Sequence, residues 1–264
     1  MISVDEFDIV PTIFPDRTSQ VWKLDDDIFN RKNVDITWDF EDESEFIHLA
    51  QLKMLLDSKN INSYLHISFL PYARQDKDVD NKSTFALHTF IKLLNNLEFN
   101  VVFVLDPHSD VSNTIYNFLP TYPRNSVEHV WKETHSNLAV YPDIGAKKKY
   151  SNIYKLPSSY AEKQRDQSTG KITSYFLHDG DYKDKTVLIV DDICDGGATF
   201  VLLAKELFKN KAKEVNLFVT HGLFTKGLKP LKEAGINRIF THKGEVFEED
   251  NNIQYEYFRF RSDI

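Results

Sequence analysis

The chain has little of several residue types, and each shortage excludes a class of protein. It contains one cysteine, Cys194, among 264 residues, so neither an intrachain disulfide nor a cysteine-based zinc site is possible. No apolar run approaches the roughly 18–20 residues needed to cross a bilayer. The acidic first residues also lack the pattern of a secretory signal. We therefore expect no membrane association and a cytoplasmic location.

Positive charge is also scarce. The chain carries 40 acidic and 32 basic residues, for a net charge of -8, and it has no long block of Lys or Arg. Nucleic-acid-binding domains more often carry a basic excess. We therefore expect no nucleic-acid partner, and any small anionic ligand would need a local group of cations.

Short apolar runs alternate with helical patterns along most of the chain. The runs have the composition of buried strands and occupy residues 64–70, 101–105, 137–141, 186–190 and 214–220. Apolar residues recur at helical spacing over residues 45–59, 84–99 and 198–212. This alternation predicts an α/β protein with parallel sheets and crossover helices.

One polar stretch interrupts this alternation. Residues 120–136 contain two prolines and have no clean period, which is typical of a connection. We therefore predict two α/β domains, residues 1–136 and 137–264, with ligand sites behind the carboxyl ends of their strands.

The stretch "VLIVDDICDGGATF", residues 187–200, places acids and glycines directly behind an apolar run. The glycines let the backbone turn tightly and bring its N–H groups against an anion. The following helix would direct its positive end to the same place, and Thr199 can cap that helix and donate its hydroxyl. Asp191 and Asp192 would repel each other unless they bind hydroxyls or a metal, and a ribose offers vicinal hydroxyls. An ordinary acidic turn with a helix cap is the alternative.

This string resembles the phosphoribosyl diphosphate (PRPP) motif of type I phosphoribosyltransferases and PRPP synthetases, D-D-hydrophobic-x-D-T-G/A-G-T behind a strand. Gly196 stands where Thr is usual, and Ala198 where Gly is usual. The motif does not distinguish synthesis of PRPP from its consumption. The resemblance implies a ribose 5-phosphate site formed by Asp191, Asp192, Asp195, Gly196, Gly197, Ala198 and Thr199.

Two upstream segments resemble the PRPP synthetases, or ribose-phosphate diphosphokinases, alone. "PYARQD" is similar to their Y-A-R-Q-D segment, which implies ATP contacts by Arg74, Gln75 and Asp76. "VLDPH" is similar to their D-L-H segment and places Asp106 and His108 near the ATP phosphates and a metal. Taken alone, the first segment also fits a solvated loop, and the second also fits a surface His after a strand with a capping Asp.

Two further segments resemble parts of the family that bind the metal and carry catalytic residues. "PDIG" resembles the family's P-D-x-G segment, and the likeness implies that Asp143 binds Mg²⁺ together with His108 and Asp106. "AEKQR" resembles the segment that opens a mobile catalytic loop, with Lys163 and Arg165 at the catalytic positions. Glu162 and Gln164 depart from that pattern, and an ordinary exposed loop is the alternative.

The likeness extends toward both ends of the chain. "FPDRTSQ" is similar to an F-x-D-G-E segment that reaches the adenine of a neighbouring subunit; Asp16 matches, whereas Arg17 and Thr18 do not. "VTHGLFTKG" (219–227) resembles a T-H-x-x-F-S-G turn. Beyond Thr241 the chain no longer follows the family.

The resemblance implies two tandem type I phosphoribosyltransferase-like domains, the first on the ATP side and the second on the ribose 5-phosphate side. It implies a Mg²⁺-dependent transfer of diphosphate from ATP to ribose 5-phosphate, in a homo-oligomer (dimer or hexamer). A type I phosphoribosyltransferase that consumes PRPP is one alternative. A regulatory subunit that resembles PRPP synthetases but has lost turnover is another, because Arg17, Thr18 and Gln164 depart from the pattern.

Overall fold

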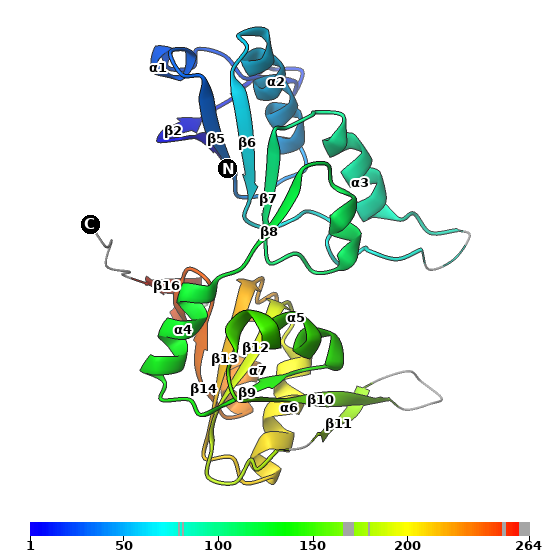
Figure 1. Cartoon of the computed structure of the whole chain (residues 1–264), viewed down its shortest axis with the longest axis vertical. Helices are drawn as coiled ribbons and strands as arrows, with labels where there is room; N and C mark the ends of the chain where they lie inside the picture. Colours follow the sequence, from blue (N-terminus) through cyan, green and yellow to red (C-terminus); the bar gives the residue numbers. More distant parts are fainter. Residues whose placement is uncertain (79, 81, 166–171, 179, 250–251, 259–264) are drawn as a thin grey trace. The chain divides into compact units, whose positions relative to one another are not determined.

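The computed structural model describes residues 1–78, 80, 82–165, 172–178, 180–249 and 252–258. The chain forms two compact units, Met1–Tyr122 and Pro123–Ile264 (Figure 1). Each unit is built around its own apolar core. The division falls within the stretch 120–136 that was interpreted as a connection. Most of that stretch is not a linker, however, because residues 124–133 form a helix of unit 2.

Unit 1 contains a six-stranded sheet in the order β2-β1-β5-β6-β7-β8. Its last four strands are parallel, and β1 and β2 are antiparallel additions at one edge. The strands are β1 (Ile2–Val4), β2 (Phe7–Ile9), β5 (Asn33–Trp38), β6 (Asn62–Ile67), β7 (Val101–Leu105) and β8 (Phe118–Thr121). The other elements are the hairpin β3 (Thr12–Ile13) and β4 (Ser19–Gln20), helices α1 (Asp26–Phe29), α2 (Glu45–Ser58) and α3 (Ala86–Asn95), and the 3-10 helix η1 (Asp110–Thr114).

Unit 2 contains an eight-stranded sheet in the order β11-β10-β9-β12-β13-β14-β15-β16. The parallel strands are β9 (Leu138–Tyr141), β10 (Ser158–Arg165), β12 (Thr186–Cys194), β13 (Glu214–Gly222) and β14 (Ile236–Phe240). Antiparallel strands extend both edges: β11 (Ile172–Leu177), β15 (Gly244–Glu249) and β16 (Asn252–Tyr257). The helices are α4 (Arg124–Glu133), α5 (Ile144–Tyr154), α6 (Ala198–Lys209) and α7 (Lys229–Glu233).

The predicted α/β class with mainly parallel sheets is confirmed. The apolar run of the central strand β12 predicted a buried strand correctly, since Val187, Leu188, Ile189 and Val190 are all fully buried. Strands covered on both faces are apolar throughout rather than alternating. The strand does not end at residue 190, however. It continues to Cys194 in parallel register with β13, so Asp191 and Asp192 belong to the strand itself.

Three other segments form elements that were not predicted from the sequence. Residues 161–165, expected to open a loop, complete strand β10 and pair with β11. The lysine-rich segment behind β9 forms helix α5. The tail beyond Thr241, for which no structure was assigned, forms an antiparallel pair of strands. Throughout the described ranges, none of the helices combines the length and apolarity needed to span a bilayer.

Candidate functional site

The end of strand β12 and the start of helix α6 form a glycine turn. Gly197 is the residue before the helix and has φ 75°, in the left-handed region. A Cβ at this position would also lie 3.0 Å from Cδ2 of Leu231 in α7. Backbone conformation and close packing therefore both require glycine here. The turn leaves the first N–H groups of α6 open to an anion.

Thr199 does not cap helix α6 as predicted. The capping position belongs to Gly197, and no side chain makes a capping hydrogen bond there. Because the helix begins at Ala198, Thr199 is already its second residue. The prediction that its hydroxyl binds phosphate is independent of capping and stays a prediction.

Carboxylates gather at the end of β12. Burial raises the pKa of Asp191 well above its ordinary value, and the charges of Asp192 and Asp143 raise it further. Asp191 Oδ1 accepts the Asp192 N–H at 3.0 Å. Hydroxyl donors or a cation would stabilise this crowded negative charge.

The turn behind β13 touches the same loop, which the sequence analysis missed. Thr225 Oγ1 donates to Asp195 Oδ1 at 2.6 Å. The side chain of Lys226 lies over Gly196, with Cδ and Cε each 3.3 Å from where a Cβ would stand. The sequence did contain a sign of this contact, because the polar pair Thr225 and Lys226 follows the buried strand β13. The segment "VTHGLFTKG" that contains the pair was interpreted only as a turn.

Asp143 and Lys163 meet at the neighbouring strand ends. Asp143 precedes helix α5, and its Oδ1 accepts the Ala146 N–H at 2.9 Å. Its other oxygen, Oδ2, accepts from Lys163 Nζ at 3.2 Å. The parallel pairing of β9 with β10 brings the two residues together. Two residues that the resemblance assigned separate roles are thus an ion pair in unit 2.

Lys163 lies on a strand rather than in the predicted mobile loop. Figure 1 shows β10 and β11 side by side at one edge of unit 2. Arg165 is the last residue of β10, and its side chain lies outside the described part of the chain. Residues 166–171 of the predicted loop also lie outside it.

The predicted ATP residues of unit 1 follow two neighbouring strands. Residues 74–76 follow β6, and Asp106 and His108 follow β7. Because β6 and β7 are parallel and adjacent, both segments leave the sheet from its carboxyl end. Asp106 is buried, and its N–H donates to Thr121 O at 2.8 Å. His108 is exposed.

Tyr72 anchors the segment that carries Arg74. Its φ is 61°, and its hydroxyl donates to Glu43 Oε1 at 2.5 Å. This hydrogen bond, with burial, raises the pKa of Tyr72 to about 12, so the hydroxyl stays a neutral donor. Arg74 and Gln75, next along the chain, have exposed side chains.

Asp16 lies in the turn of the β3–β4 hairpin. Its Oδ1 accepts from Thr18 N–H at 3.0 Å and from Thr18 Oγ1 at 2.7 Å. These hydrogen bonds, that of the hydroxyl first, lower the pKa of Asp16. Thr18, which departs from the family pattern, thus stabilises the turn. Gln51 and His48 of α2 hold the hairpin through Ser19.

The three predicted metal ligands do not all belong to one unit. Asp106 and His108 lie in unit 1, and Asp143 lies in unit 2. Within the described ranges, no three His, Cys, Asp or Glu side chains form a group suited to a metal. The assignment of this ligand set stays a prediction.

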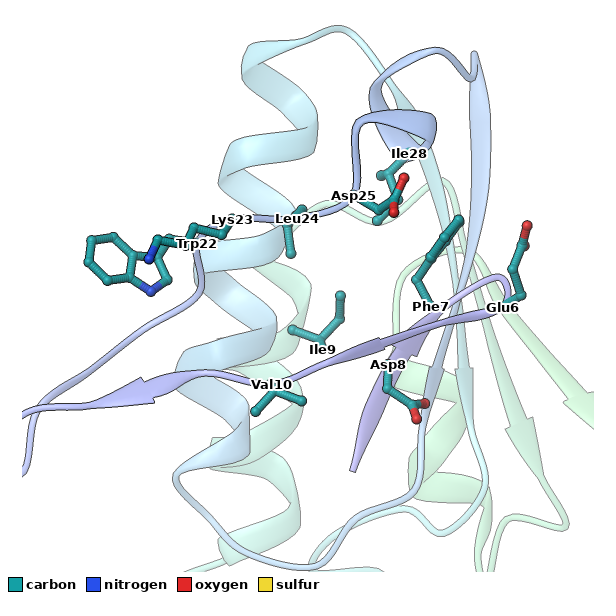
Figure 2. Close-up of a pocket in the computed structure, with 10 residues that line it drawn as sticks. All are labelled: Glu6, Phe7, Asp8, Ile9, Val10, Trp22, Lys23, Leu24, Asp25 and Ile28. Carbon is teal, nitrogen blue, oxygen red and sulfur yellow. The ribbon is translucent and has the colours of Figure 1, made fainter.

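A cavity of about 410 Å³ lies elsewhere in unit 1. Figure 2 shows its lining, which combines the carboxylates of Glu6, Asp8 and Asp25 with apolar side chains and Lys23. The Lys23 ammonium lies 4.8 Å from the Trp22 ring centroid. None of the predicted site residues lines this cavity, and its excess of carboxylates is unfavourable for a triphosphate.

The fold and the glycine turn of unit 2 define a phosphoribosyl transferase domain. The phosphoribosyl transferase domain family matches residues 148–254, which include β12 and the turn that leads into α6. The fold alone is also shared with the phosphoribosylpyrophosphate synthetase from Mycobacterium smegmatis. That likeness has a TM-score of 0.70 at 20% identity and covers 88% of this chain and 78% of the other.

Two curated relatives extend the likeness over both units. The ribose-phosphate pyrophosphokinase of Sulfurisphaera tokodaii is 25% identical over 251 residues, 91% of this chain and 86% of that protein. The protein of the same name from Mycoplasma genitalium is 30% identical over 190 residues, 67% of this chain and 56% of that protein. The chain belongs to the ribose-phosphate pyrophosphokinase family.

Proposed function

We propose that this chain is a ribose-phosphate diphosphokinase. It transfers the β,γ-diphosphoryl group of ATP to the 1-hydroxyl of D-ribose 5-phosphate and releases PRPP and AMP, which feeds nucleotide biosynthesis. The match to an enzyme of this name over 91% of the chain carries the proposal. A type I phosphoribosyltransferase would need only the domain matched at residues 148–254, and unit 1 would then have no counterpart.

Unit 2 is the ribose 5-phosphate side of the reaction. The turn Asp195–Thr199 takes the 5-phosphate at the start of α6, where backbone N–H groups favour an anion. Asp191 and Asp192 accept hydrogen bonds from the ribose hydroxyls. The raised pKa of Asp191 supports this role, because hydroxyl donors stabilise a carboxylate that burial and its neighbours disfavour.

Unit 1 is the ATP side. Arg74, Gln75 and Asp76 bind the nucleotide, and His108 lies near its phosphates. Their placement behind two adjacent parallel strands supports one shared site at the carboxyl end of the sheet. Asp16 contributes from the β3–β4 turn, at the segment that in the family reaches a neighbouring subunit. A second copy of the chain is therefore the proposed partner.

Mg²⁺ suits the acidic end of unit 2. It is commonly held by one or two carboxylates together with substrate phosphates. Asp143 has an accessible carboxylate beside Asp191, whose pKa is raised first by burial and then by the charges of Asp192 and Asp143. Asp143 would hold the ion on the side of unit 2, and His108 and Asp106 stay the predicted metal ligands of unit 1. The bound ion would neutralise charge on the phosphates.

Lys163 and Arg165 stabilise the diphosphoryl group as it moves. Phosphoryl transfer depends mainly on positioning and on compensation of charge. The ion pair with Asp143 supports a role for Lys163, because it holds the ammonium group beside the acidic end of β12. In the reaction, the 1-hydroxyl oxygen attacks Pβ, the bond from Pβ to the α-phosphate oxygen breaks, and the hydroxyl proton leaves to solvent.

One coupled assay tests the proposal. The full chain is incubated with ATP, Mg²⁺ and ribose 5-phosphate, and AMP and PRPP are measured together. We expect both in equal amounts. Pyrophosphate release from PRPP that depends on a nucleobase would instead identify a phosphoribosyltransferase. Binding of ribose 5-phosphate without AMP formation would identify a regulatory subunit.

A further inference from the structure

The loop assigned to the 5-phosphate has no cation of its own. Residues 191–199 contain three aspartates and no Lys or Arg. A phosphate bound there would meet Asp191, Asp192 and Asp195 with only backbone N–H groups and the Thr199 hydroxyl to compensate. Since like charges in a partly buried site repel strongly, a positive group from another segment would stabilise the bound phosphate.

Lys226 is placed to supply that group. Its aliphatic chain runs over Gly196, with Cγ, Cδ and Cε between 3.3 and 3.5 Å from where a Cβ would stand. The side chain is exposed. Within the described part of the chain, no carboxylate pairs with it, whereas the nearby Lys229 lies 3.9 Å from Glu233.

The turn that carries Lys226 is held against the loop on both sides. Leu223 N–H donates to Cys194 O at 2.8 Å, and Thr225 Oγ1 donates to Asp195 Oδ1 at 2.6 Å. Gly227 N–H closes the turn onto Phe224 O at 2.8 Å. Leu228 N–H donates to Glu248 Oε2 at 2.7 Å. The backbone of Lys226 is therefore fixed beside the loop, which lowers the entropy cost of using its side chain.

Two departures from the family pattern meet at this contact. The loop has Gly196 where Thr is usual, and the T-H-x-x-F-S-G turn has Lys226 at its final Gly position. The side chain missing from the loop leaves the space that the lysine crosses. A family-type Thr at 196 would need Lys226 to move.

We propose that Lys226 is a phosphate-binding residue of the ribose 5-phosphate site, and that it depends on Gly196 for its position. This inference rests on the proposed function of unit 2. It adds a ligand from a segment outside the PRPP motif. It also predicts that the charge of Lys226 acts on the phosphate group and leaves the ribose hydroxyls unaffected.

Calorimetric titration of the full chain with ribose 5-phosphate, without ATP, tests the proposal. We expect Lys226→Met to weaken binding about tenfold, the scale of one charge-assisted hydrogen bond. Inorganic phosphate should lose affinity in the same proportion, and unphosphorylated ribose should lose none. Lys229→Met removes a nearby lysine charge and should leave ribose 5-phosphate affinity unchanged. The loss of ribose 5-phosphate affinity caused by Lys226→Met should be smaller at high salt, because salt screens an exposed charge.

A double-mutant cycle tests the dependence on Gly196. Gly196→Thr should displace the flexible end of Lys226 and itself weaken ribose 5-phosphate binding. In that background, Lys226→Met should have a much smaller effect than in the parent chain. Fully additive losses would contradict the proposed dependence.

The outcomes separate this inference from the proposed function. If the parent chain forms AMP and PRPP but Lys226→Met binds ribose 5-phosphate as tightly as the parent, the inference alone is wrong. If the parent binds ribose 5-phosphate through Lys226 yet forms no AMP, the diphosphokinase proposal alone is wrong. A parent chain that binds neither ribose 5-phosphate nor inorganic phosphate overturns both.

Discussion

At the scale of single residues, the site of unit 2 brings together carboxyl groups whose proximity is unfavourable when no ligand is bound. Asp191 is crowded by Asp192 and by Asp143, and its pKa is raised. Asp143 divides its two oxygens between the N-terminus of α5 and Lys163. Such arrangements cost stability in the free protein and are frequent at binding sites, where a ligand relieves them.

The raised pKa of Asp191 predicts a pH-dependent stability effect. The folded chain keeps the Asp191 proton to higher pH than the unfolded chain does. The free energy of unfolding therefore falls as pH rises from the ordinary carboxyl pKa through the raised one, and this loss persists above it. We expect Asp191→Asn, which keeps an Oδ1 acceptor for Asp192 N–H, to be more stable than the parent at neutral pH. The gain should vanish in acid.

Urea unfolding midpoints measured across that pH range check this expectation. Asp181→Asn is the matched control, because Asp181 is exposed and accepts a similar local hydrogen bond from Lys183 N–H. A midpoint difference for Asp191→Asn that does not change with pH would contradict the expectation. The same variant should bind ribose 5-phosphate weakly, because it loses the charged acceptor.

Lys163 offers a second prediction at this scale. Lys163→Ala should lower kcat roughly 10²–10³-fold, the scale of losing one preorganised electrostatic donor. It should leave ribose 5-phosphate affinity little changed. Steady-state assay and calorimetry on the same preparation give the two numbers. Lys147→Ala, which removes a lysine that lies 4.5 Å from the Tyr160 ring centroid, is the control. Unaltered turnover in Lys163→Ala would exclude it from the mechanism.

At the scale of elements, the phosphate turn depends on how β12, α6 and α7 meet. Gly197 adopts a left-handed conformation, and Leu231 of α7 packs against its Cα. For Gly196, its neighbour, the three atoms nearest to an added Cβ all belong to the flexible side chain of Lys226. The two adjacent glycines are therefore constrained in different ways, the first by a mobile side chain and the second by backbone and core.

This difference predicts unequal costs for the same substitution. Gly197→Ala should lower the free energy of unfolding by about 1–2 kcal/mol, because a Cβ is unfavourable in the left-handed region and Leu231 must also shift. Gly196→Ala should cost clearly less, since the lysine side chain can move aside. Denaturant unfolding of both variants measures the difference. Equal losses would show that Leu231 packing and the positive φ do not decide the choice of glycine.

At the scale of the whole molecule, the chain divides into two units with separate cores. Helix α4 belongs to the second, although the predicted domain boundary at 136 placed it in the first. Ser126 Oγ of α4 donates to His242 O at 3.2 Å, and Glu133 forms an ion pair with Arg238. Val127 and Val130 are fully buried. These contacts tie the start of unit 2 to its far strands.

The position of α4 predicts how fragments behave. Residues 123–264 should fold cooperatively and bind ribose 5-phosphate without catalysis, because their core is complete. Residues 137–264 lack α4 and should be less stable by more than about 2 kcal/mol, the scale of losing the burial of even one valine side chain. Urea unfolding of the two fragments compares them directly. Equal stability would place the boundary at 136 after all.

The sequence by itself determined the elements whose pattern is local. Val101–Leu105 was predicted as a strand within its observed bounds, and helices α2 and α6 began where their apolar periodicity begins. The acids and glycines of 191–197 were also recognised as a binding motif, because all residues of this motif are adjacent in the sequence. Both depend on spacing within a few residues, which sequence displays directly.

Only the tertiary structure decided contacts between distant segments. Asp143 meets Lys163 because β9 and β10 are parallel neighbours. Lys226 meets Gly196 because the turn behind β13 is bonded to the end of β12. Helix α4 was not predicted for the same reason, since its few apolar residues become buried only when the helix packs against the rest of unit 2. Strand order and packing arise from the whole core, and no local pattern along the chain encodes them.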